Sequence, residues 1–145
     1  MSTIARSDAL APMIAQAVPA PDLIALATAV ARGRLATAQH RYAQAADHYR
    51  AAIALERRIP YQEPAYWYYP VHQSLGAALF LAGRPDEASA AFRQALIQAP
   101  NNGWALYGLA RAETAQGHEA EAAAARKALI SAWSGDPDWL QMERL

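Results

Sequence analysis

Apolar residues recur every three to four positions along most of the chain, and short breaks rich in glycine or proline divide this pattern into segments. Leu75 and Leu79 lie four residues apart, and Phe92 and Leu96 repeat that spacing in the next segment. Such a period places the side chains on one face of an α-helix. The pattern therefore predicts two consecutive helices between residues 70 and 99.

Small residues and helix breakers indicate how these two helices meet. Gly76 and Ala88 lack bulk, which lets two antiparallel helices cross closely. Gly83 can adopt the left-handed conformation that ends the first helix, while Pro85 suits the opening turn of the second. Pro100 then stops the second helix. The segment is expected to fold as a helical hairpin.

The order of these residues resembles the tetratricopeptide repeat, a helix-turn-helix of about 34 residues. The residues that carry the likeness are His72, Leu75, Gly76, Leu79, Gly83, Ala88, Phe92, Ala95 and Pro100. The resemblance implies an all-α fold, in which stacked helical hairpins form a right-handed solenoid with each unit burying its apolar face against its neighbours.

The same template fits two further stretches of the chain. The first unit covers residues 26–57, the second 69–102 and the third 103–134. Small and aromatic residues keep the register in the first unit, whereas Arg126 stands in the third unit where the template expects an aromatic ring. We therefore expect one domain of about three units.

Both ends of the array are expected to carry capping segments, because a repeat buries its face only against neighbours. Residues 1–25 are interpreted as an N-terminal capping helix, a linker or the remnant of a preceding repeat. Residues 135–145 are expected to form a C-terminal capping helix, in which Trp139, Leu140 and Met142 cover the third unit.

An insertion interrupts the repeat period before the second unit. The first two unit starts are 43 residues apart and the next two are 34 apart, and the extra residues fall at 58–68. Aromatic side chains fill Tyr66–Tyr69, and we expect most of them to seal this junction. Pro70 suits the first turn of the following helix. Alternatively, that helix starts at Pro64 and is kinked at Pro70.

Composition supports a helical protein and removes several classes of function. Thirty-eight of the 145 residues are alanine, against seven glycines and nine prolines, which favours helices. Lys plus Arg equal Asp plus Glu at thirteen each, so no electrostatic footprint for nucleic acid is present. No apolar run reaches the roughly 18–20 residues of a membrane-spanning helix. We expect no membrane insertion, and a cytoplasmic rather than a periplasmic location.

Motifs for catalysis are lacking from the sequence. The chain has no cysteine, which removes thiol catalysis and thiolate metal sites. Its four histidines have neither the spacing nor the carboxylate neighbours of a zinc site. The acidic pairs fall at expected helix starts, where they compensate the helix dipole. We therefore predict a non-enzymatic protein with no catalytic residue, no metal and no cofactor.

The family resemblance implies a binding surface in the concave groove, lined by the first helix of each unit. Transferred by position, it gives partner-binding candidates at Arg34, Gln73, Phe80, Trp104, Tyr107, Arg111 and Thr114, with Tyr66 and Trp67 at the rim. Such a groove suits a peptide with an apolar anchor and an acidic group. The alternative for the aromatic candidates Trp104 and Tyr107 is that their rings stack between neighbouring repeats and only stabilise the fold. The alternative for the two arginines is that they are solvated surface residues or form local ion pairs.

The function expected from these observations is that of a scaffold which binds a protein or peptide partner in its groove. Two alternatives use the same architecture: a homodimerisation or structural module, and a small-ligand sensor or accessory domain of a larger protein. The chain also resembles the C-terminal part of longer bacterial tetratricopeptide proteins, so that Met1 would begin a fragment.

Overall fold

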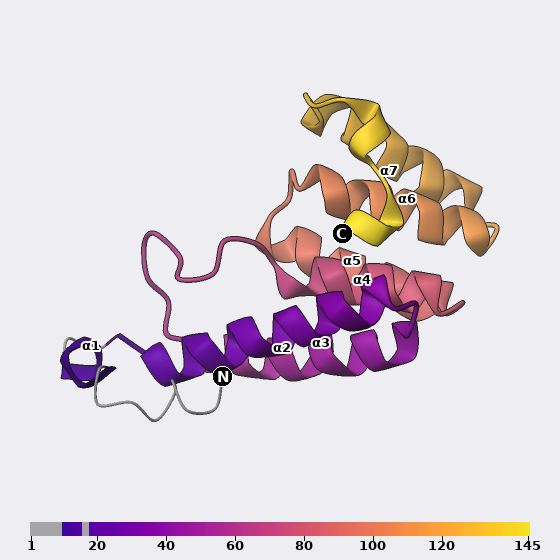
Figure 1. The fold of residues 1–145 in the computed structure, drawn as a ribbon. Helices are drawn as coiled ribbons and strands as arrows, with labels where there is room; N and C mark the ends of the chain where they lie inside the picture. The colour runs from indigo at the N-terminus through magenta and orange to yellow at the C-terminus, as the bar shows by residue number, and fades with distance from the viewer. Residues whose placement is uncertain (1–9, 16–17) are drawn as a thin grey trace.

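Helices joined by turns make up the part of the chain that the computed structural model describes, residues 10–15 and 18–145, and no strand occurs in these two ranges (Figure 1). The all-α prediction is confirmed. In chain order the elements are α1 (Ala11–Ala15), α2 (Ala20–Ala38), α3 (Tyr42–Glu56), α4 (Val71–Leu81), α5 (Pro85–Gln98), α6 (Gly103–Ala115), α7 (Glu119–Ala132) and the 3-10 turns η3 (Pro137–Trp139) and η4 (Met142–Arg144).

Three helical hairpins stack in chain order. Helix α2 packs on α3, α4 on α5 and α6 on α7, while α3 contacts α4 and α5 contacts α6 (Figure 1). The first helices of the second and third hairpins, α4 and α6, also touch each other. This arrangement places α2, α4 and α6 along one side of the array, which we call the inner face.

Aromatic rings fill the gaps that glycines leave between crossing helices. A Cβ atom added to Gly33 would lie 2.6 Å from the ring of Tyr49, and one added to Gly76 would lie 2.8 Å from the ring of Phe92. A Cβ on Gly108 of the next hairpin would also collide with Phe92. Both rings are buried. Phe92 thus fixes the crossing inside its own hairpin and the stacking of the following one.

Each hairpin turns through one residue in the left-handed region. These residues are His40, Gly83 and Gly117, with φ angles of 56°, 76° and 76°. Gly83 and Pro85 act as predicted, since α5 begins at Pro85. His40 shows that the first turn takes the same shape without glycine, which the sequence did not indicate.

The last hairpin has a cluster of charged side chains in addition to its aromatic contacts. Arg126, at the position where an aromatic was expected, stays exposed and pairs with Glu119 at 3.5 Å. Buried Glu113 of α6 instead accepts hydrogen bonds from Arg93 of α5 and His118 at the start of α7, both at 2.8 Å. Burial alone would raise the pKa of Glu113, but the hydrogen bonds it accepts outweigh this effect and lower it.

The two ends of the array differ from the expected caps. Helix α2 begins at Ala20, six residues before the first unit expected from the repeat template, and residues 1–9 and 16–17 of the expected N-terminal cap lie outside the described residues. At the other end, η3 and η4 replace the expected capping helix of residues 135–145. Extended backbone at Gln141 separates these turns, and this bend lets the last residues reach the inner face.

The junction before α4 also differs slightly from expectation. Helix α4 begins at Val71, so Pro70 precedes the first turn with an extended ψ of 119°. The alternative of a helix from Pro64 that is kinked at Pro70 is wrong, because residues 61–70 contain no helix and most of residues 63–69 form bends. Nine of the eleven residues of helix α4 are buried, because this helix packs against α3, α5 and α6.

Replacing Gly76 by leucine should destabilise the protein by roughly 1–3 kcal/mol or more, because the new side chain meets the ring of buried Phe92. Urea unfolding followed by circular dichroism measures the change. The control is Ala90→Leu on the exposed side of α5. Equal stability of the two variants would contradict the packing described for this crossing.

Acid should weaken the third hairpin through Glu113. Its pKa is lowered from the ordinary value of 4.5 in the folded protein, so its stabilising effect is complete above that value and is lost as the pH falls through the lower folded value. Glu113→Gln should therefore lose less stability than the wild type between about pH 5 and pH 3. Urea midpoints across this range that shift equally in both proteins would count against the assignment.

Candidate functional site

One patch of the inner face combines aromatic rings with an exposed cation. The Arg111 guanidinium lies 5.9 Å from the ring centres of both Phe80 and Tyr107, and its Nη1 donates to the Tyr107 hydroxyl at 3.2 Å. Both rings are half-buried, and they come from neighbouring helices, α4 and α6. The patch offers an apolar surface beside a positive charge, which suits an apolar side chain next to an acidic group.

Three other candidates have interactions within the protein. Gln73 is buried, and its Oε1 accepts from Asn102 Nδ2 at 2.8 Å. Trp104 stacks edge-on against Trp133, with ring centres 5.0 Å apart. The Thr114 hydroxyl donates to a backbone carbonyl one turn earlier at 2.8 Å and accepts from a guanidinium of α7 at 3.0 Å. These contacts include the structural stack expected as the alternative for Trp104, and a role of the three residues in partner binding stays a prediction.

Arg34 lies at the other end of the inner face, against the aromatic junction Tyr66–Tyr69. Its guanidinium is 5.7 Å from the ring centre of Tyr69 and donates to the Tyr68 hydroxyl at 3.3 Å. The Trp67 and Tyr69 rings pack against the core, while Tyr68 is 77% exposed. Trp67 and Tyr69 therefore seal the insertion against the core, while Tyr68 reaches the surface.

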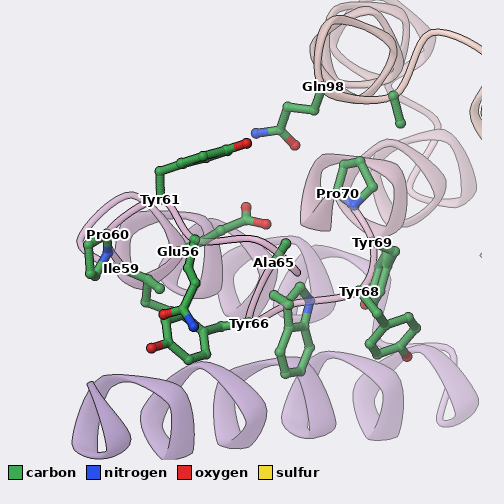
Figure 2. A pocket seen from close by; sticks show the side chains of 13 residues that line it. Glu56, Ile59, Pro60, Tyr61, Ala65, Tyr66, Tyr68, Tyr69, Pro70 and Gln98 are labelled. Carbon is green, nitrogen blue, oxygen red and sulfur yellow. The ribbon is translucent and has the colours of Figure 1, made fainter. Parts of the chain in front are cut away.

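The proposed rim residues Tyr66 and Trp67 line a cavity of about 510 Å³ on the far side of this junction (Figure 2). Its walls come from the end of α3, the insertion and the end of α5. Glu56 projects into it and is the one charged side chain among the lining residues. Burial raises the pKa of Glu56, while the Val71 amide and the charge of Arg57 act in the opposite direction.

The last four residues of the chain occupy part of the inner face, which the sequence did not predict. Figure 1 shows the chain returning from the end of α7 past α6 toward α4, and η4 contacts α4. Met142 and Leu145 are buried within the hydrophobic core cluster. The Ser74 hydroxyl donates to the Leu145 carbonyl oxygen at 2.7 Å and lies 3.3 Å from the Tyr69 hydroxyl. We call residues 142–145 the docked tail.

A second cavity, of about 300 Å³, adjoins the docked tail. Residues of the tail form one wall, and side chains of the first two hairpins form the others: Arg34, Thr37, Ala38, His40, Tyr49, Ser74 and Ala77. Met142 therefore lies beside the first two hairpins, a contact that the sequence did not predict, and Trp139 is 58% exposed. The expected covering of the third unit by Leu140 stays a prediction.

Within the described ranges, no cluster of three metal-binding side chains occurs, and no helix is both long and apolar enough to cross a bilayer. The inner face presents aromatic rings, and the guanidinium groups of Arg34 and Arg111 each lie over such a ring.

Comparison with known families agrees with the repeat pattern. Residues 79–143 match the family model of the tetratricopeptide repeat, which covers the end of α4, helices α5, α6 and α7 and most of the C-terminal turns. The resemblance seen in the sequence is confirmed over this range, and it indicates a protein-interaction scaffold. A search of curated proteins finds no match to the chain.

Docking of the tail can be measured by thiol labelling, because the chain has no cysteine of its own. A Met142→Cys variant should react with a thiol reagent at least about tenfold more slowly than Ile130→Cys, since residue 142 is buried and Ile130 is 80% exposed. Adding Leu145→Ser to Met142→Cys should raise the rate toward that of the control. Equal rates at positions 142 and 130 would show that the tail is not docked.

Proposed function

We propose that this tetratricopeptide repeat chain is a non-enzymatic scaffold that binds a segment of a partner protein along its inner face. The family match supports the general role, because such repeats present a preformed surface to other proteins. A preformed surface limits the ordering cost of binding. The proposal that the partner binds to the face formed by α2, α4 and α6 depends on the contacts of the docked tail.

The observation that carries the proposal is that the inner face holds a peptide segment of the chain itself. Met142 and Leu145, three residues apart, bury their side chains, and Ser74 binds the backbone of the segment. Buried apolar anchors with a few hydrogen bonds to the peptide backbone are the contacts by which grooves hold short peptides. A partner segment with two apolar residues at the same spacing would fit the same contacts.

Because the tail is part of the chain, it competes with any partner that uses the same contacts. A tethered segment has a high effective concentration, so a partner must exceed the affinity of the tail or bind where the tail does not reach. The Phe80, Tyr107 and Arg111 patch is outside the cavity that adjoins the tail. We therefore propose that a partner contacts this patch first and gains the rest of the inner face as the tail leaves.

A synthetic peptide with the sequence of residues 136–145, DPDWLQMERL, tests the proposal. It should bind the full-length variant Met142→Ser with Leu145→Ser at least about tenfold more tightly than it binds the wild type, because the released tail no longer competes. Fluorescence anisotropy of the labelled peptide measures both affinities.

Ser74 provides the check that the peptide binds at the inner face. Adding Ser74→Ala to the released variant should weaken peptide binding by about fivefold, as expected for the loss of one hydrogen bond of about 1 kcal/mol. The matched control is Ser131→Ala on the exposed side of α7. No measurable binding to the released variant, or equal loss in the two serine variants, would refute the proposal.

A further inference from the structure

We propose that the cavity behind the aromatic junction binds a small alkylated ammonium ion, with Glu56 as its counter-ion. This site is separate from the inner face, because its lining residues and those of the cavity beside the docked tail have no member in common. The proposal does not depend on the partner-binding function.

The size and walls of the cavity suit a small ligand. Its volume of about 510 Å³ lies in the range of small-molecule sites. Five aromatic residues of the insertion and of the position that follows it contribute to the lining: Tyr61, Tyr66, Trp67, Tyr68 and Tyr69. In Figure 2 the ring of Tyr61 extends toward Gln98 on one side, while Tyr66 and Tyr68 lie on the opposite side. Aromatic side chains thus make up five of the thirteen residues that line the cavity.

The charge of the cavity favours a positively charged ligand. Glu56 is half-buried and is the one ionisable acid or base of the lining apart from the tyrosine hydroxyls. No ion pair involving it is formed within the described ranges of the chain. The Val71 amide acts on one part of the carboxylate, which can accept about four hydrogen bonds in all. The Glu56 carboxylate would repel an anion, whereas a cation would neutralise its half-buried negative charge.

The same aromatic cluster already holds a cation on its other side. The Arg34 guanidinium lies over the ring of Tyr69 and bonds to Tyr68. Trp67 packs beside both rings, with centres 5.6 Å and 6.1 Å away. Aromatic rings attract cations through the negative charge of their faces, and alkylated ammonium ions are favoured because they are weakly hydrated. The cavity side of the cluster offers the same chemistry with a carboxylate added.

Choline and its uncharged isostere 3,3-dimethylbutan-1-ol form a matched pair of probes, since they differ mainly in the charge of the central atom. Nuclear magnetic resonance titration of the full chain should give saturable shifts of the Trp67 indole and of residues 56–70 with choline. The neutral probe should bind at least about tenfold more weakly. Equal binding of the two probes, or no saturable shift with choline, would overturn the proposal.

Two variants test whether the Glu56 carboxylate is the charge that attracts choline. Glu56→Gln should weaken choline binding at least about fivefold, while Glu121→Gln, which makes the same change on the exposed side of α7, should leave it unchanged. Circular dichroism confirms that both variants are folded. Unchanged affinity in Glu56→Gln would refute the role of Glu56, and the probe comparison on the wild type stands even if that variant fails to fold.

Discussion

The array depends on one kind of contact, an aromatic ring seated in a gap that only glycine leaves open. Phe92 of α5 fills the space beside Gly76 in α4 and also beside Gly108 in α6, so one side chain sets two helix crossings. Tyr49 makes the corresponding contact with Gly33 in the first hairpin. Because close-packed interiors tolerate few voids, these rings fix the distance between helices and hence the shape of the inner face.

The third hairpin combines this contact with other interactions, since a Cβ on Gly103 of α6 would lie 2.7 Å from the ring of Trp133. Its second helix has Arg126 at the repeat position of Phe92, and its first helix is held by buried Glu113 between Arg93 and His118. Trp104 and Trp133 add an edge-on contact that closes its open end. The chain then turns back, and the docked tail supplies apolar groups to the inner face. The tail therefore contributes to the core of the array as well as occupying part of its inner face.

The sequence predicted the contacts that are local and missed those that join distant residues. The spacing of Gly76, Gly83 and Pro85 gave the second hairpin and its turn, because each residue acts within a few positions of itself. The bond between Ser74 and Leu145 spans 71 residues and leaves no period in the sequence. Likewise, the template placed Gln73, Trp104 and Thr114 in the groove, but it carries no information on the neighbours that engage their side chains.

The central claim is that the inner face is a peptide-binding surface which residues 142–145 occupy in the free protein. Nuclear Overhauser effects measure this directly, since Ser74 and Leu145 are in hydrogen-bonding contact. The account predicts cross-peaks between protons of these two residues in the free protein. When a peptide that binds the inner face is added, these cross-peaks should disappear, and cross-peaks between Ser74 and the peptide should replace them. Absence of the Ser74–Leu145 cross-peaks, or peptide contacts confined to α3, α5 and α7, would contradict it.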